Sequence, residues 1–290
     1  MSELINEILA AQGLSTEVIT FEPVSGGDIN KAFYIVTADG PYFIKMNDGV
    51  DRDFFEKEST GLKLIRQADA INAPEPIGFG AIGNGTSYLI MEWIEGSPGG
   101  SDDSSLGRRL AGLHKTIMPW YGLDKDNYIG LLHQPNGRWL DWCDYYRQQR
   151  IGHQMQIAEK NGKLPLKRRK KMERLLDRLD GWVPRQPAGS LLHGDLWGGN
   201  WIAGPGGEPY VIDPAVFYGH REMDIAFSEL FGGFSDAFYR EYDETYPLDY
   251  GYTERKPIYQ LFYLLVHLNL FGESYGSAVD RILNRYADIS

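Results

Sequence analysis

The sequence predicts an α+β fold in two parts, a small antiparallel sheet followed by a larger, mainly helical region. Up to residue 95, short apolar runs alternate with turn residues, as in strands joined by hairpins. After a stretch rich in Ser, Gly and Asp at 97–103, apolar residues recur mostly at helical spacing. We therefore predict an N-terminal domain at 1–95 and a helical C-terminal domain at 96–290.

The composition limits the kinds of partner that this chain can bind. The formal net charge is -11 over 290 residues, which disfavours nucleic acid or an anionic membrane as a partner. The one basic run, 167–171, is expected to be the solvated face of a helix. A single cysteine, Cys143, leaves no partner for an internal disulfide, and the acidic N-terminus does not resemble a signal peptide. We therefore expect a cytoplasmic protein, whose oligomeric state the sequence does not predict.

A glycine-rich connection joins the first two predicted strands. After a short amphipathic helix at 3–11, strands are expected at 18–21 and 32–37, enclosing the segment 25–31. Glycines such as Gly26 and Gly27 allow backbone N–H groups to approach an anion, for example a nucleotide phosphate. Paired glycines also occur in plain turns, so this segment alone does not establish nucleotide binding.

A lysine and a glutamate are predicted to pair in the N-terminal domain. In the strand expected at 42–46, alternation directs Lys45 to the same face as Phe43. In the helix expected at 53–68, Glu58 lies within the apolar stripe. Burying a carboxylate without a partner costs several kcal/mol, so Lys45 is the expected cation. A strand lysine paired with a helix glutamate positions nucleotide phosphates in kinases, although Glu58 could also lie on an exposed helix surface.

Two further strands, at 77–79 and 87–93, are expected to complete the sheet, with a hairpin turn at Asn84-Gly85. The extended residues at the end of the second strand are Glu92, Trp93 and Ile94. Their backbone N–H and C=O groups could bind adenine, which requires no particular side chain.

The C-terminal domain is predicted to consist mainly of helices. The expected segments are 106–117, 139–161, 166–179, 223–231 and 256–272. His114 lies beside the apolar stripe of the first of these helices, and we interpret it as a packed core residue rather than a catalyst.

The segment 191–200 has the spacing of a kinase catalytic loop. In loops of the form H-x-D-x-x-x-x-N, the Asp accepts the proton of the attacking hydroxyl and the Asn binds magnesium. His193, Asp195 and Asn200 occupy these positions. A short apolar run then delivers Asp213, which fits a second metal ligand. Asp or Asn beside Gly also marks ordinary turns, so the loop is significant only together with the preceding features.

The chain contains a glycine-rich hairpin, a strand lysine, a helix glutamate and a loop with catalytic spacing, in the same order as in kinases. The chain therefore resembles the two-lobed protein-kinase-like fold. Trp197 stands where protein kinases usually have a lysine, and Asp213 is followed by Pro-Ala rather than Phe-Gly. Only about ten residues separate Asp213 from the next predicted helix, too few for an activation segment. The resemblance thus implies a small phosphoryl acceptor, as for aminoglycoside and choline kinases.

Longer motifs make the chain similar to the fructosamine kinases, also called ketosamine-3-kinases. They are the segments 23–30, 141–142, 149–151, 192–200, 212–222, 259–262 and 269–272. Such enzymes phosphorylate the 3-hydroxyl of sugars joined to amines by an Amadori linkage, on a free or protein-bound ketosamine. The product is unstable and releases the amine, so the family is regarded as deglycating.

The resemblance also implies roles for single residues, with ATP and Mg²⁺ as cofactors. Asp195 becomes the catalytic base, Asn200 and Asp213 the magnesium ligands, and Lys45 with Glu58 the phosphate-positioning pair. His193 and Asp224 are predicted to support the loop, whereas Trp197, His267 and Asn269 are candidates for substrate binding. The alternatives are a kinase of another small alcohol and a nucleotide-binding module without turnover.

Overall fold

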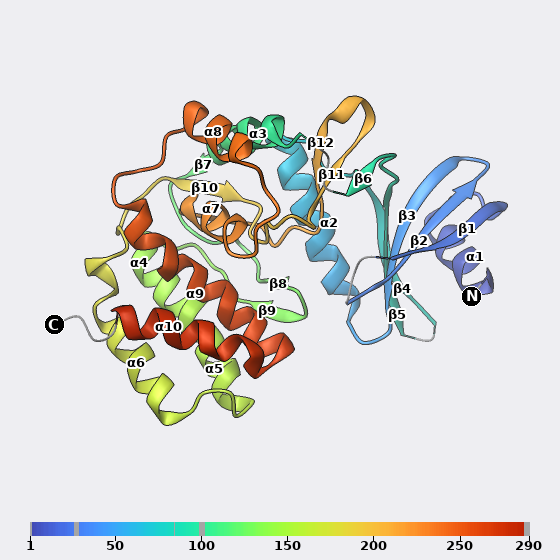
Figure 1. Ribbon diagram of the computed structural model, residues 1–290. Helices are drawn as coiled ribbons and strands as arrows, with labels where there is room; N and C mark the ends of the chain where they lie inside the picture. Colours follow the sequence, from blue (N-terminus) through green and yellow to red (C-terminus); the bar gives the residue numbers. More distant parts are fainter. Residues whose placement is uncertain (1, 26–28, 84, 99–101, 287–290) are drawn as a thin grey trace. The chain divides into compact units, whose positions relative to one another are not determined.

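The computed structural model describes residues 2–25, 29–83, 85–98 and 102–286, and its chain divides into two compact units (Figure 1). The N-terminal unit consists of residues 1–101 and 200–214, and the C-terminal unit of 102–199 and 215–290. The segment 200–214 therefore belongs with the N-terminal residues, although in the sequence it begins at the end of the predicted catalytic loop, residues 191–200. That the N-terminal domain binds the nucleotide and the C-terminal domain carries out catalysis stays a prediction.

The N-terminal unit is built on a five-stranded antiparallel sheet in the order β1-β2-β3-β5-β4. Its strands are β1 (Val18–Val24), β2 (Lys31–Thr37), β3 (Gly40–Asn47), β4 (Pro76–Ile82) and β5 (Thr86–Glu92). The helices are α1 (Ser2–Ala11) and α2 (Arg52–Gln67). Tyr42, Ile44 and Met46 alternate along β3 and join the buried cluster that contains residues of α1. The predicted strands and helices of this unit are confirmed, whereas Gly26, Gly27 and Asn84 lie outside the described residues.

A second, three-stranded sheet of the N-terminal unit holds the segment 200–214. Its order is β12-β11-β6, with β6 (Ser97–Pro98), β11 (Trp201–Ala203) and β12 (Pro209–Val211). The N–H of Val211 donates to the carbonyl of Asn72 (2.9 Å), and this bond attaches the β11–β12 hairpin to the rest of the unit. A Cβ on Gly96 would lie 2.1 Å from the carbonyl oxygen of Ala203, so only glycine permits this approach of the two chains.

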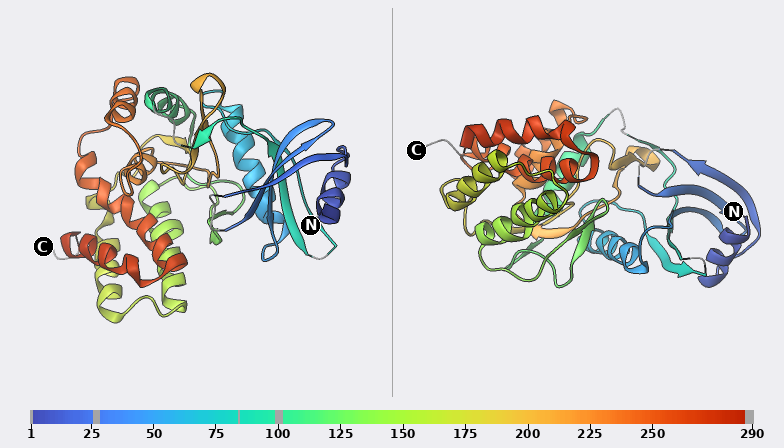
Figure 2. Two further views of the ribbon diagram at one scale, coloured as in Figure 1. Left: turned by 45° about the vertical axis from the view of Figure 1, so that its right-hand side comes forward. Right: turned by 90° about the horizontal axis from the view of Figure 1, so that it is seen from below.

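The C-terminal unit is mainly helical, as Figures 1 and 2 show. Its helices are α3 (Ser104–His114), α4 (Trp142–Tyr145), a π-helix (Tyr146–Gly152), α5 (His153–Lys160), α6 (Leu166–Asp177), α7 (Glu222–Ser228), α8 (Asp236–Thr245), α9 (Tyr252–Phe271) and α10 (Gly276–Tyr286). Its strands are β7 (Ile117–Met118), β8 (Asn127–Ile129), β9 (Leu132–Gln134), β10 (Gly189–Leu192) and β13 (Phe217–Gly219). Strands β13, β10 and β7 form one sheet in that order, and β8 pairs with β9.

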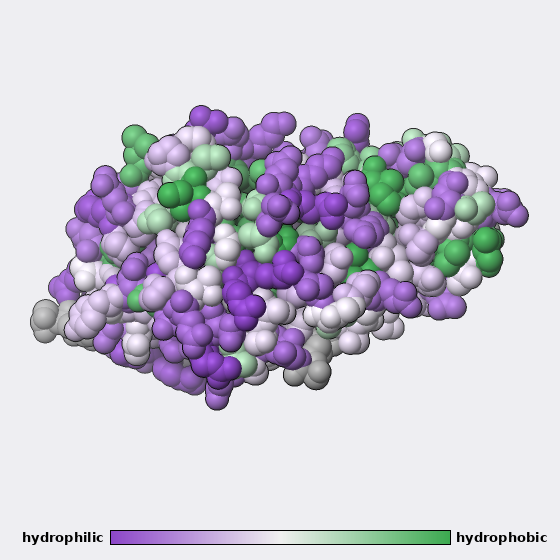
Figure 3. All heavy atoms as spheres, turned by 90° about the horizontal axis from the view of Figure 1, so that it is seen from above, coloured by the Kyte–Doolittle hydropathy of each residue, from purple (hydrophilic) through white to green (hydrophobic). Residues whose placement is uncertain are grey.

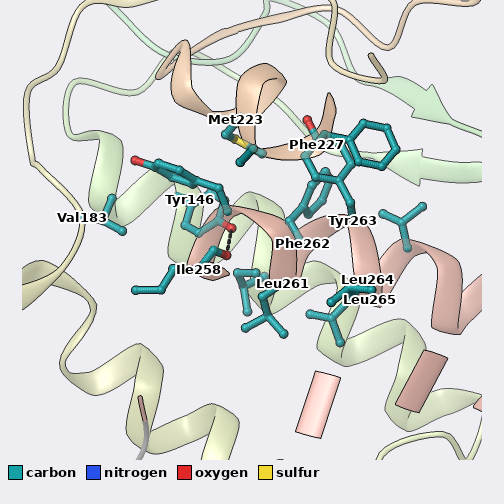
Figure 4. Packing of buried hydrophobic residues seen from close by; sticks show 14 of the residues in the cluster. Tyr146, Val183, Met223, Phe227, Ile258, Leu261, Phe262, Tyr263, Leu264 and Leu265 are labelled. Carbon is teal, nitrogen blue, oxygen red and sulfur yellow. Dashed lines mark hydrogen bonds between the residues drawn. The ribbon is translucent and has the colours of Figure 1, made fainter. Parts of the chain in front are cut away.

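Helix α9 forms the centre of the C-terminal core (Figure 4). Ile258, Phe262 and Tyr263 on this helix are buried together with Tyr146 of the π-helix and Met223 of α7. The hydroxyl of Tyr146 donates to the carbonyl oxygen of Ile258 at 2.7 Å, which satisfies a polar group inside this core. The core therefore holds the helices on both sides of the catalytic loop in place.

Several predicted boundaries in the C-terminal unit are wrong. The helix expected at 106–117 ends at His114, and Ile117 is 59% exposed because the chain turns there and pairs as β7 with β10. The helix expected at 139–161 begins at Trp142 and contains the π-helix. Within the basic run 167–171, Arg168 is buried rather than solvated, because it forms ion pairs with Glu273 and Asp280.

The face drawn in Figure 3 is largely polar over the C-terminal unit, and apolar groups gather more densely over the N-terminal unit. The apolar side chains exposed on the N-terminal sheet include Ile19 and Phe21 of β1 and Ile77 of β4. Among the described helices, none is long and apolar enough to span a bilayer.

Candidate active site

Three charged side chains meet in the N-terminal unit. The alternation of β3 directs Lys45 away from α1, and α2 presents Glu58 to it, with 2.6 Å between Lys45 Nζ and Glu58 Oε1. Lys45 Nζ also donates to Oδ1 of Asp213. The side chains of Lys45 and Glu58 are only 7% and 12% exposed, whereas that of Asp213 is 44% exposed. The cluster therefore has a buried pair on one side and a more accessible carboxylate on the other.

The electrostatics of this cluster favour a cationic ligand. Burial acts to lower the pKa of Lys45, but the charges of Asp213 and Glu58 outweigh it, so the pKa is raised and the lysine stays charged. Burial raises the pKa of Glu58, and the charge of Lys45 opposes that shift. With all three groups ionised, two carboxylates face one ammonium, which leaves one excess negative charge near Asp213.

Asp213 has a strained backbone conformation. Its φ of 56° lies in the left-handed region, and in the described chain only Asp69 is another non-glycine residue with positive φ. Such conformations cost on the order of 1 kcal/mol, less for Asp than for most residues, and persist where the surroundings determine them. Here the conformation accompanies the ion pair with Lys45, as is typical of a functional site.

Asn200 and Asp213 converge at one end of the β11–β12 hairpin. Trp201 pairs with Val211 in the ladder, and the N–H of Ile212 donates to the carbonyl oxygen of Asn200 (3.0 Å). The two strands therefore place Asn200 beside the residue that precedes Asp213. An amide oxygen and a carboxylate are ligands that Mg²⁺ accepts, so the chemistry of this pair fits the predicted metal site.

The segment predicted to bind adenine is partly occupied by internal hydrogen bonds. The N–H of Glu92 donates to the carbonyl oxygen of Glu75 (2.9 Å), which corrects the expectation that this N–H binds a base. The ring of Trp93 lies against Tyr34 of β2, with centroids 4.3 Å apart, and near Phe43 of β3. These rings form an aromatic surface on the face of the sheet that carries Lys45.

In the C-terminal unit, Asp224 holds the start of the predicted catalytic loop. Its carboxylate accepts the backbone N–H groups of His193 (2.7 Å) and Gly194 (2.9 Å), just after β10 ends. Gly194 has a φ of 82°, and a Cβ there would lie 2.1 Å from the carbonyl oxygen of Ala215, so glycine is required. The N–H of Asp195 donates to His193 Nδ1 at 3.3 Å, and the Asp195 side chain is half-buried. These contacts fix the backbone on which Asp195 is carried.

His114 and Tyr242 extend this support, although no sequence motif had assigned them to the site. His114 Nε2 lies 3.1 Å from Asp224 Oδ2, and its Nδ1 lies 2.8 Å from the hydroxyl of Tyr242. Burial lowers the pKa of His114, so the imidazole is neutral near pH 7. Its Nε2–H then donates to Asp224, and Nδ1 accepts from Tyr242. The prediction of a packed core histidine is confirmed, since His114 is fully buried.

The three substrate-binding candidates lie in different environments. Trp197 is 41% exposed, and its indole covers Gly199, where a Cβ would lie 2.3 Å from the ring. His267 is half-buried, with Nδ1 2.8 Å from the carbonyl oxygen of Tyr263. Asn269 is buried, and its amide donates to the backbone and side-chain oxygens of Gln154. The amide of Asn269 thus joins α9 to α5, and its role in substrate binding stays a prediction.

Known structures place this fold in one class. An aminoglycoside phosphotransferase has a TM-score of 0.68 over 98% of this chain and 99% of its own, at 16% identity. At that identity the similarity concerns the fold alone. The N-terminal antiparallel sheet with its lysine–glutamate pair, followed by a helical unit with an H-x-D loop, thus defines a protein of the protein-kinase-like fold.

The chain belongs to the fructosamine kinase family, whose model matches residues 1–288. A "Probable ketoamine kinase" of Enterococcus faecium is 42% identical, covering 97% of this chain and 99% of its own length. A chloroplastic protein-ribulosamine 3-kinase of Oryza sativa subsp. indica is 35% identical, covering 97% and 83%. The crystal structure of a candidate fructosamine-3-kinase from Haemophilus somnus has a TM-score of 0.86 at 33% identity, covering 97% and 96%.

Proposed function

We propose that this protein transfers the γ-phosphoryl group of ATP to the 3-hydroxyl of ketosamines, which are sugars joined to amines through an Amadori linkage. Membership of the fructosamine kinase family supports this activity, as do the names of relatives that concern ketoamines and ribulosamines. The structural observation that carries the proposal is the cluster of Lys45 with Glu58 and Asp213.

In this proposal the N-terminal unit binds the nucleotide. Glu58 holds the Lys45 ammonium, which donates to the α- and β-phosphates. Asn200 and Asp213 provide oxygen ligands for Mg²⁺, which neutralises phosphate charge when bound. The aromatic surface beside Trp93 receives the base, and the glycine pair Gly26-Gly27 stays a predicted phosphate contact. The backbone carbonyl of Glu92 and the backbone of Ile94 are the remaining adenine contacts.

The C-terminal unit is proposed to position the acceptor. Asp195 accepts a hydrogen bond from the sugar hydroxyl and takes its proton as the phosphoryl group is transferred. Asp224 and His193 fix the loop backbone, so the backbone position of Asp195 is set before the substrate binds. The exposed indole of Trp197 is available to cover an apolar face of the sugar.

The chain after Asp213 supports a small acceptor. Helix α7 begins at Glu222, nine positions after Asp213, and the short strand β13 lies within this interval. This interval is too short for the long segment on which protein kinases dock a peptide. The proposed product, a 3-phosphorylated ketosamine, is unstable and releases its amine, so the proposed role is deglycation. The free, buried thiol of Cys143 supports a reducing compartment, and the proposed compartment is the cytoplasm.

One assay tests the proposal. The protein is incubated with ATP, Mg²⁺ and a panel of fructosyl-lysine, ribulosyl-lysine, an aminoglycoside and choline, and products are identified by mass. We expect one added phosphoryl group on the two ketosamines and none in the reactions without Mg²⁺. Phosphorylation of only the aminoglycoside or choline would refute the ketosamine assignment, and turnover of no acceptor would favour a binding module.

A further inference from the structure

An exposed aromatic patch lies at the C-terminal end of α9. It consists of Phe231, His267, Phe271 and Tyr275, and the ring centroid of His267 lies 4.7 to 5.6 Å from those of the other three. Phe231 is 44% and Phe271 51% exposed. Isolated exposed rings are normal on a protein surface. Here two exposed phenylalanines are joined through the half-buried ring of His267, and together they form a contiguous apolar area that suits a ligand.

The patch is attached to the catalytic loop through the segment 229–235, which carries Phe231. At one point this segment touches the loop directly, since a Cβ on Gly198 would lie 3.0 Å from the Cα of Gly233. At its end, the backbone N–H of Ser235 donates to Asp103 at 2.7 Å. Gly198 is three residues from Asp195, so their Cα atoms are separated by at most about 11 Å. The segment is thus fixed beside the loop that carries the predicted base.

The rings of the patch match the chemistry of a substituted amine. Aromatic faces attract an ammonium group and also pack against methylene groups. Burial lowers the pKa of His267, so its ring is neutral near pH 7 and does not repel a cation. Lys256, which lies earlier on α9, is paired with Glu229 at 2.5 Å. An ammonium with an attached hydrocarbon chain is therefore complementary to this surface.

We infer that the patch binds the substituent on the ketosamine nitrogen, and that the preferred substrates carry an extended alkyl chain there, as the side chain of a glycated lysine does. This inference rests on the proposed function. In a ketosamine the nitrogen lies only a few bonds from the 3-hydroxyl, so a hydroxyl held at Asp195 places the start of the substituent close to the catalytic loop. Sugar and substituent are then recognised by different parts of the C-terminal unit.

The test compares two substrates that differ only in the chain on nitrogen, N-fructosyl-methylamine and N-fructosyl-hexylamine. For the wild-type protein we expect kcat/KM to be about 5- to 20-fold higher for the hexyl compound, a range set by hydrophobic contacts on an open surface. Phe271→Ser and Phe231→Ser, on separate elements, should each reduce this ratio towards one. The matched control is Tyr250→Ser, a fully exposed aromatic residue of the same unit outside the patch, which should leave the ratio unchanged.

Each outcome decides between the inference and its alternatives. A wild-type ratio near one, or a ratio that survives both phenylalanine substitutions in proteins with unchanged melting temperature, would overturn the inference while ketosamine turnover still supports the proposed function. Failure of the wild-type protein to phosphorylate either compound would overturn the proposed function and the inference with it. If one phenylalanine variant fails to fold, the ratio measured for the other variant is decisive, because the two rings come from different segments.

Discussion

Two buried carboxylates, Glu58 in the N-terminal unit and Asp224 in the C-terminal unit, are stabilised in different ways. Glu58 faces the ammonium of Lys45, which is shared with Asp213. Asp224 accepts two backbone N–H groups and the N–H of the neutral His114. An ammonium on a long side chain can turn towards a phosphate, whereas backbone donors stay where the fold places them.

In our proposal, this difference separates a carboxylate that takes part in ligand binding, Glu58, from one that maintains the structure, Asp224. Replacing a member of the Lys45 cluster should change phosphate binding and turnover. Replacing Asp224 removes the acceptor of two fixed donors, so it should reduce the free energy of unfolding. Substitutions in the two units can test this separation.

The largest effect is expected for Asp195→Asn. The amide keeps the shape of the side chain but cannot take the proton, so kcat should fall by about 10²- to 10⁴-fold, the range for loss of a general base. Nucleotide affinity, which we assign to the other unit, should persist and can be measured by titration calorimetry. Turnover close to that of the wild type would show that Asp195 is not the base.

Lys45→Met and Glu58→Gln should be strongly non-additive. Either substitution alone misplaces the phosphates, so adding the second substitution should lower kcat/KM for ATP only a little further. We expect a double-mutant cycle on kcat/KM for ATP to give a coupling energy of about 1 to 3 kcal/mol. A coupling below about 0.5 kcal/mol would mean that the two residues do not act as a unit.

Asp224→Asn should act mainly on stability. The amide has one acceptor oxygen, so one of the two loop N–H groups is left facing an NH₂ group. The free energy of unfolding should fall by about 2 to 3 kcal/mol, measured by urea denaturation. Asp177→Asn, at an exposed carboxylate of α6, is the control and should change it by less than about 0.5 kcal/mol. An equal loss in both variants would remove the contrast between Glu58 and Asp224.

Trp197→Leu distinguishes substrate contact from support of the loop. Because the indole is 41% exposed, its removal should leave the melting temperature almost unchanged. If the ring covers the sugar, KM for fructosyl-lysine should rise several-fold while KM for ATP stays constant. A large drop in melting temperature with an unchanged acceptor KM would instead assign the ring to loop support.

The smallest effect concerns pH. The pKa of His114 is lower in the folded protein than its ordinary value of 6.5, so the unfolded chain takes up the proton first on acidification. Stability from this residue is therefore complete above about pH 6.5 and is lost as the pH falls towards the folded-state pKa. Between about pH 7.5 and about pH 5.5, the melting temperature of His114→Gln should decrease less than that of the wild-type protein. An undiminished decrease would mean that other groups dominate the acid response.

Local patterns were sufficient to predict the N-terminal sheet and the pairing of Lys45 with Glu58. Alternation fixes which side of a strand a residue occupies, and helical period fixes the buried face of α2. A charged residue within such a face requires a partner, and a strand lysine was nearby in the sequence. These inferences needed no knowledge of long-range contacts.

The parts that could not be predicted depend on distant residues. The second half of helix α9 is apolar on most sides, so its period could not show that Asn269 faces the core. His114 reaches Asp224 and Tyr242 across more than a hundred residues of sequence. Helix α8 was missed although Ser235 caps it by accepting the N–H groups of Ala237 and Phe238, a signal that the sequence contains.

The discontinuity of the N-terminal unit has a consequence for synthesis of the chain. Residues 1–101 emerge from the ribosome without the hairpin 200–214, which contributes β11 and β12 to their second sheet and brings Asn200 and Asp213. Domains usually fold from the N-terminus as they are made. Here the N-terminal unit is complete only after much of the C-terminal unit has been translated. A truncation after residue 101 therefore leaves β6 without its partner strand β11. The proposed nucleotide site would gain Asn200 and Asp213, its two predicted metal ligands, late in translation.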